Sequence, residues 1–323
     1  MDRTLERFYS GRTVLVTGFT GEAGSWLMQA LLMLGADVVG FGVNRTEKGS
    51  SFGTGKSLFD LSGLTARSEH DRTAPKKEGA PRFHAVTGSV KDLYLCRETF
   101  MKTEPEIVFH LAPGLYGAAL LAGNSRSAAF HRVAGLSEME PDFPGDPVRT
   151  YEEAVLGTVH VLDCVRTTTT EFGGDTGRRC VRSFVYIAGN GAERGEKAGR
   201  NALCCSLREP GIDVPRSQCS ELETDARCSA LEAVKTWRHC YFEGEGAAGV
   251  CAVVGGGGNP PALVRACLDA GMRHYDHPGE EGTITLPDET AWSGQERFLR
   301  VRGEHPERIP AEMRAILNEV LSV

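Results

Sequence analysis

The stretch Thr13-Val-Leu-Val-Thr-Gly-Phe-Thr-Gly-Glu-Ala-Gly-Ser-Trp-Leu27 decides the fold of this chain. Its first five residues are apolar or β-branched, as in a strand that is buried on both faces. Gly18, Gly21 and Gly24 follow at a spacing of three residues. Apolar residues then recur at helical spacing, and Gly35 stands where that helix would end. Strand, glycine turn and helix together predict the first unit of an α/β fold.

The same glycines have the spacing of a dinucleotide-binding turn. There Gly18 allows the tight bend, Gly21 lets the backbone approach a pyrophosphate, and Gly24 lets the helix pack closely. The N–H groups and the dipole of the helix N-terminus then face the phosphates. We therefore expect the turn, including Phe19 and Thr20, to bind NAD or NADP. The alternative is that the glycines serve only the packing of the helix.

Two other strand ends bear on the cofactor. The second strand, residues 37–43, runs into a segment without the carboxylate that often binds the adenosine ribose. Arg45 follows it, and this arginine either meets a 2′-phosphate, which favours NADP, or is a solvated loop residue. The fourth strand, residues 106–112, should end beside the cofactor, which places Leu111 and Ala112 there.

Composition restricts the class of protein. The chain has 323 residues, is 41% hydrophobic and carries a net charge of −7, which argues against a general nucleic-acid binder. No apolar run is long enough to span a membrane, and no secretory signal is visible at the start. The 10 cysteines form no Cys-x-x-Cys pair, so we expect no metal and reduced thiols in an intracellular compartment, the cytoplasm by default. The pair His274 and His277 is expected in a loop without a nearby carboxylate, and is not predicted to bind metal.

Strands and helices alternate along the chain, which predicts a doubly wound parallel sheet, the Rossmann fold. Strands are expected at 13–17, 37–43, 83–87, 106–112, 183–188 and 249–254, and helices at 91–102, 149–166, 227–242 and 261–270. Polar loops are expected at 65–81 and 167–179, and irregular insertions near 114–147 and 190–225. Residues 1–255 are predicted to form the NAD(P)-binding domain, and residues 256–323 a small C-terminal substrate-type lobe with a strand at 283–286 and a helix at 311–321. Four cysteines and one histidine are expected in the core: Cys96, Cys164, Cys251, Cys267 and His110.

The chain resembles the extended short-chain dehydrogenase/reductases, and among them the CDP-glucose 4,6-dehydratase branch of the nucleotide-sugar 4,6-dehydratases. The resemblance is carried by residues 8–27, by Pro105-Glu-Ile-Val-Phe-His-Leu-Ala112 and by residues 146–162. It continues more loosely through residues 250–259 and 287–292. It implies an NAD(P) cofactor, a sugar-nucleotide substrate and a dimer built on two helices per subunit, here 149–166 and 227–242.

The catalytic residues that this family uses are missing. A family member needs a tyrosine with a lysine four residues later, and no Tyr-x-x-x-Lys occurs in these 323 residues. Alignment puts Glu223 and Arg227 in their places, and Asn190 falls in the segment that should supply a hydroxyl, an acid and a base. Ala154 replaces the helix asparagine of the family, and Ser89 the aspartate that contacts adenine.

Three interpretations follow. The chain is a catalytically silent member that keeps the fold, with NAD or NADP either weakly bound or lost, and serves a binding, regulatory or assembly role. Alternatively it is an active NAD(P)-dependent dehydratase or epimerase with a rebuilt site that uses Glu223, Arg227, His110 or a residue of 190–225. In the third interpretation it is a scaffold subunit without cofactor. The first is the principal prediction, with a homodimer or a protein complex as the assembly.

Overall fold

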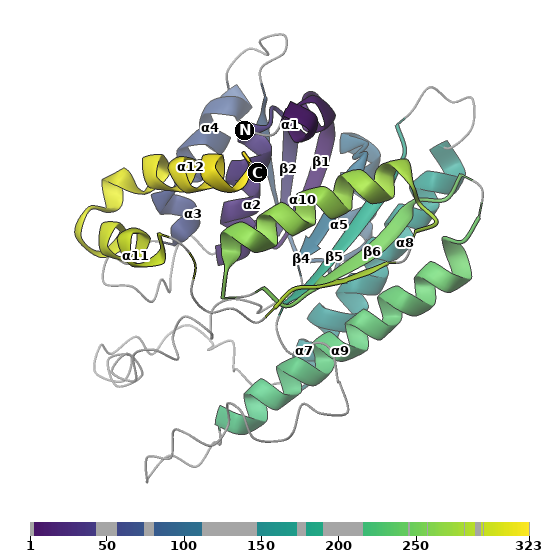
Figure 1. Ribbon diagram of the computed structural model, residues 1–323. Coiled ribbons are helices and arrows are strands. Elements are labelled where there is room, and N and C mark those ends of the chain that lie inside the picture. The colour runs from purple at the N-terminus through teal and green to yellow at the C-terminus, as the bar shows by residue number, and fades with distance from the viewer. Residues whose placement is uncertain are drawn as a thin grey trace.

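A parallel sheet of seven strands forms the centre of the molecule, in the order β3-β2-β1-β4-β5-β6-β7 (Figure 1). The computed structural model describes residues 3–42, 57–73, 81–111, 147–172, 179–189, 216–244, 246–256, 258–280, 282–287, 292 and 294–322. The strands are β1 (Thr13–Thr17), β2 (Asp37–Gly42), β3 (Phe83–Thr87), β4 (Ile107–Leu111), β5 (Ser183–Gly189), β6 (Gly249–Val254) and β7 (Thr283–Thr285). This strand order, with its reversal between β1 and β4, confirms the predicted doubly wound fold.

Helices cover both faces of the sheet. The described segments are α1 (Arg3–Tyr9), α2 (Glu22–Met33), α3 (Leu58–Leu61), α4 (Leu64–Thr73), α5 (Leu93–Thr103), α7 (Pro147–Tyr151), the π-helical η1 (Glu152–Leu156), α8 (Gly157–Phe172), α9 (Arg216–Tyr241), α10 (Pro260–Asp276), α11 (Gln295–Glu304), the 3₁₀ segment η2 (Pro306–Arg308) and α12 (Ile309–Val320). Among the described helices, none is both long and apolar enough to cross a membrane.

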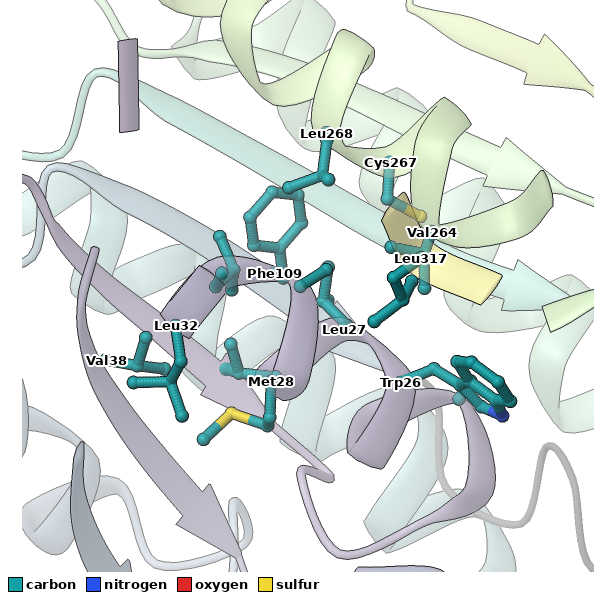
Figure 2. Packing of buried hydrophobic residues seen from close by; sticks show 14 of the residues in the cluster. Trp26, Leu27, Met28, Leu32, Val38, Phe109, Val264, Cys267, Leu268 and Leu317 are labelled. Atoms are coloured by element: carbon teal, nitrogen blue, oxygen red, sulfur yellow. The ribbon is translucent and has the colours of Figure 1, made fainter. Parts of the chain in front are cut away.

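Two hydrophobic cores lie on opposite faces of the sheet because side chains alternate along each strand. In β1, Val14 and Val16 join the core under α2, α10 and α12, whereas Leu15 joins the core under α5, α8 and α9. Figure 2 shows side chains of the first core, among them Leu27 and Met28 of α2, Phe109 of β4 and Leu268 of α10. The expected burial of the four cysteines and of His110 is confirmed, since each side chain is 1% exposed.

Residues 65–81 were expected as a polar loop, and this was wrong for their first part, which forms most of α4. The helix follows the short α3, whose first turn is closed by a capping box between Ser57 and Asp60. Asp71 in α4 pairs with Arg67 at 3.0 Å and accepts a hydrogen bond from the backbone of Phe83 at 2.9 Å. These contacts hold a polar helix that hydrophobic periodicity cannot reveal.

Two other helices are longer than their apolar periodicity predicted. The segment 167–179 was expected as a loop, but α8 continues to Phe172, and the hydroxyls of Thr168 and Thr169 bond to carbonyls one turn earlier. α9 was expected at 227–242 but begins at Arg216, so the end of the irregular segment 190–225 is helical. No glycine or proline interrupts α9, which allows it to extend beyond its apolar stripe.

The C-terminal region contributes to the main sheet. β7 pairs in parallel with β6, and α10 packs in the core with α2. His274 was expected in a loop, but α10 runs past Gly271 to Asp276, and His274 is therefore a buried helical residue. A glycine suits position 271 because a Cβ atom there would lie 2.6 Å from the Tyr9 hydroxyl. The domain boundary at residue 255 stays a prediction, and the expected insertion at 114–147 lies almost wholly outside the described residues.

Candidate functional site

The glycine turn connects β1 to α2 at the carboxyl edge of the sheet. Gly18 has a φ of +67°, in the left-handed region that favours glycine. Its N–H donates to the carbonyl of Phe41 at 3.1 Å, and Gly21 N–H donates back to the Gly18 carbonyl at 3.1 Å. A Cβ atom on Gly18 would also lie 3.3 Å from Cβ of Leu111, at the end of β4. The turn is therefore tight and lies against the neighbouring strand.

Gly24 is the most constrained glycine of this turn. A Cβ atom at this position would lie 2.5 Å from the Gly18 carbonyl oxygen and 2.8 Å from the Phe19 carbonyl carbon. Any larger residue would therefore push the first turn of α2 away from the loop. Gly21 is the residue that precedes the helix, and no side chain of its own caps the helix N-terminus. This arrangement leaves the start of α2 to face the carboxyl edge of the sheet.

The remaining residues of the turn differ in their surroundings. Phe19 is 2% exposed, and its ring packs edge-on against Phe59 at a centroid distance of 5.2 Å. The ring also fills the space above Gly40, where a Cβ atom would lie 2.7 Å from it. Phe19 therefore serves the core with its side chain, and only its backbone faces the turn. Thr20 is half-buried.

The other predicted cofactor positions are only partly described. Leu111 is 5% exposed at the end of β4, next to the turn. Ser89 follows β3, and its hydroxyl accepts a hydrogen bond from the backbone N–H of Lys91 at 3.2 Å. Two predicted cofactor residues, Arg45 and Ala112, lie outside the described residues.

The structure describes the three residues predicted at catalytic positions to different extents. Asn190 lies outside the described residues, and Glu223 lies in α9 with a side chain that is not described. Arg227 lies one turn further along α9 and is half-buried. Its guanidinium partly opposes the rise in the pKa of Tyr186 on β5, which burial raises above its usual range. The part of α9 that follows Arg227 packs against β5 in the second hydrophobic core.

A buried polar chain crosses from β1 to α8 beneath the carboxyl edge. Thr17 Oγ1 lies 2.6 Å from His110 Nδ1, and His110 Nε2 lies 2.9 Å from Thr158 Oγ1. The Thr158 hydroxyl donates to the Ala154 carbonyl, so it accepts from the histidine. Burial lowers the pKa of His110 to about 3. His110 is therefore a neutral connector of elements, as expected for a structural histidine.

One polar pair escaped sequence reasoning because its members are 74 residues apart. The Tyr151 hydroxyl of α7 donates to the carboxylate of Asp225 on α9, two residues beyond Glu223. Both side chains are half-buried. This pair joins α7 to α9. α7 and η1 precede the first turn of α8, where Thr158 meets His110 of β4. No local sequence pattern indicates this contact.

A second missed pair lies at the start of α2. Arg302 of α11 donates from Nη1 to both carboxylate oxygens of Glu22, at 3.0 and 3.1 Å. Both side chains are largely buried, with exposures of 6% and 12%. Their sequence separation of 280 explains why no local sequence signal could predict the contact. Within the described part of the chain, no group of three or more metal-ligating side chains occurs.

Part of the chain is similar in sequence to known proteins. Residues 14–132 match the sequence model of the NAD dependent epimerase/dehydratase family. A curated relative, CDP-glucose 4,6-dehydratase of Salmonella typhimurium, is 28% identical over 161 residues. That alignment covers 50% of this chain, and only 32% of the relative's length.

Solved structures give a looser likeness. The enzyme WbmG of Bordetella bronchiseptica, solved in complex with NAD, is 16% identical with a TM-score of 0.38, over 76% of this chain and 52% of WbmG. UDP-glucose 4-epimerase of Thermotoga maritima, solved with UDP-glucose, is 18% identical with a TM-score of 0.38, over 75% of this chain and 54% of the epimerase. The fold is shown by the strand order of the sheet. In sequence, residues 14–132 of this chain are therefore similar to the NAD dependent epimerase/dehydratase family.

Proposed function

We propose that this chain binds NAD or NADP at the turn from Gly18 to Gly24 and is silent as a nucleotide-sugar 4,6-dehydratase. Its role is then one of binding, regulation or assembly. The observation that supports this proposal most is a contrast between two elements. The turn keeps the close approach of Gly24 to the Gly18 carbonyl, whereas α9 lacks a tyrosine with a lysine four residues later.

The residues of the turn fit a dinucleotide diphosphate. The first N–H groups of α2 would hold its oxygens, since no side chain of Gly21 competes for them. Leu111, at the end of β4, would lie beneath the nicotinamide half. When bound, the cofactor supplies hydride transfer. The residues of this turn only bind and orient it.

Chemistry on the sugar requires more. Oxidation at the 4-hydroxyl needs a base within hydrogen-bond reach and with a pKa near the working pH. Glu223 takes the place of the family tyrosine, and a carboxylate is ordinarily ionised with a pKa near 4. Arg227 replaces the lysine, but it does not reproduce the compact point charge of an ammonium group. General acid–base groups contribute roughly 10²–10⁴-fold each, so their combined loss should leave turnover undetectable.

Binding is tested by calorimetry with NAD, NADH, NADP and NADPH. We expect the natural chain to bind at least one of them and Gly21→Val to bind it at least tenfold more weakly, because a branched side chain would enter the phosphate path. Gly279→Val is the matched control, since a Cβ atom at Gly279 meets nothing within 4 Å. Absence of heat with all four dinucleotides would favour the scaffold without cofactor.

The rebuilt enzyme is a second candidate, favoured by the hydrogen bond between Tyr151 and Asp225. A phenol bonded to a carboxylate is a combination that can move a proton, and it lies on α7 and α9. If this candidate holds, sugar-nucleotide turnover should occur and should fall at least a hundredfold in Asp225→Asn. Under our principal proposal the natural chain and this variant are equally inactive.

A further inference from the structure

The C-terminal helix α11 reaches the first turn of α2 through a buried ion pair. Arg302 Nη1 contacts both carboxylate oxygens of Glu22, at 3.0 and 3.1 Å. The two side chains are 6% and 12% exposed. Such a pair is weakly screened by solvent, so each charge depends on the other for compensation.

Aromatic packing holds this ion pair in place. Trp26 lies one turn after Glu22 on α2, and Phe298 lies one turn before Arg302 on α11. Their ring centroids are 5.0 Å apart, and Trp292 packs against both rings at 6.0 Å. Trp26 is fully buried and Phe298 is 2% exposed. The ion pair and the aromatic contact, one turn apart on each helix, therefore dock α11 on α2. Leu317 of α12 belongs to the same core, and Figure 2 shows it near Leu27 of α2.

Glu22 occupies a sensitive position for an anion site. It is the first residue of α2 and directly follows Gly21, so its own N–H belongs to the helix end that faces a bound phosphate. A carboxylate so near a diphosphate would repel it in a medium of low dielectric constant. Because Arg302 neutralises this carboxylate and holds it toward α11, the turn remains able to accept an anion.

We propose that Arg302 is an affinity-determining residue for the dinucleotide diphosphate, acting through Glu22 from a helix 280 residues away. This inference rests on the proposed binding of NAD or NADP at the glycine turn. It assigns α11 to the nucleotide site, although α11 itself contributes no residue to the turn. By linkage, a bound dinucleotide should also strengthen the docking of α11 on α2.

The two partners of the pair should have opposite effects on affinity. Burial raises the pKa of Glu22 and Arg302 opposes that rise, so Arg302→Gln is titrated at alkaline pH, where the carboxylate keeps its charge. There we expect it to weaken dinucleotide binding about tenfold. Glu22→Gln leaves a positive charge beside the diphosphate, and should bind at least as tightly as the natural chain. The double variant removes both charges and should return to within about threefold of the natural affinity. Adenosine, which carries no phosphate, should bind all four proteins alike.

Calorimetry with NAD or NADP, whichever the natural chain binds, and with adenosine measures these affinities, and circular dichroism confirms that each variant is folded at the titration temperature. Should Arg302→Gln prove unfolded, Arg302→Lys takes its place, because it keeps a positive charge beside Glu22 and should bind the dinucleotide within about threefold of the natural affinity; a tenfold loss in this variant would overturn the inference. Equal weakening in both single variants, or a parallel loss of adenosine binding, would show a purely structural role and overturn the inference. If the natural chain binds no dinucleotide, both the proposed function and this inference are overturned. If it binds tightly and Arg302→Gln binds with the same affinity, the inference alone is overturned.

Discussion

His110 shows how one buried residue joins three elements. Its ring is 1% exposed and lies between Thr17 of β1 and Thr158 of α8, while the residue itself belongs to β4. Burial lowers its pKa from the ordinary 6.5 to about 3. The folded protein therefore keeps this histidine neutral at pH values at which the unfolded chain takes up a proton.

This difference predicts a loss of stability in mild acid. Between pH 6.5 and 3 the unfolded state binds one proton more than the folded state, so the free energy of unfolding falls as the pH falls. From pH 7 to pH 5 the contribution of His110 should decrease by about 2 kcal/mol. Urea denaturation at the two pH values should show this extra loss in the natural chain and not in His110→Asn. The same loss in both proteins would assign the effect to other groups.

Gly24 gives a prediction about the turn itself. Alanine at this position would place a Cβ atom 2.5 Å from the Gly18 carbonyl oxygen, so the turn must open. We expect Gly24→Ala to lower the free energy of unfolding by about 2 kcal/mol. Gly303→Ala in α11 is the control, since nothing lies within 4 Å of its Cβ position, and it should stabilise the helix slightly. Equal melting temperatures for Gly24→Ala and the natural chain would mean that the turn is looser than described.

At the scale of elements, the helices, strands and turns that have a local sequence pattern were predicted correctly. The glycine turn and the buried strands have patterns of their own, and both appear where expected. α4 and the first turns of α9 do not, since both stretches are polar. In α4, the contact of Asp71 with Phe83 helps to hold a helix that has no apolar stripe. The same holds for the candidate site. The local glycine spacing predicts the roles of Gly18 and Gly24, whereas no local pattern predicts the partner of Glu22.

The docking of α11 on α2 should appear as non-additive stability. Arg302→Gln leaves a buried carboxylate without its ion pair, and Glu22→Gln leaves a buried guanidinium in the same state. Each single variant should lose about 3 kcal/mol of unfolding free energy, and the double variant should lose clearly less than the sum. Urea denaturation of the four proteins measures this coupling. Strict additivity would contradict a direct interaction between the two side chains.

At the scale of the whole molecule, α7 to α9 offer a surface for assembly. Three large apolar side chains are exposed on these elements, with Val148 at 65%, Leu156 at 44% and Tyr241 at 55%. We predict a two-fold dimer, or a complex with another protein, built on residues 149–166 and 227–242. Leu156→Arg should shift the molar mass measured by light scattering toward the monomer, whereas Leu299→Arg on α11 should not. A natural chain that is monomeric at micromolar concentration and recovers no partner would contradict this prediction.

The central claim is that this chain lacks dehydratase turnover. A product analysis tests this claim most directly. The protein is incubated with NAD and a panel of sugar nucleotides that includes CDP-glucose, and the mixture is examined by mass spectrometry for a 4-keto-6-deoxy product, which is lighter than its substrate by one water. Because our proposed alignment puts Glu223 and Arg227 in the places of the family's tyrosine and lysine, we predict that every sugar nucleotide is recovered unchanged. A product that forms above background and disappears in Glu223→Gln or Asp225→Asn would contradict catalytic silence and establish a rebuilt active site on α9.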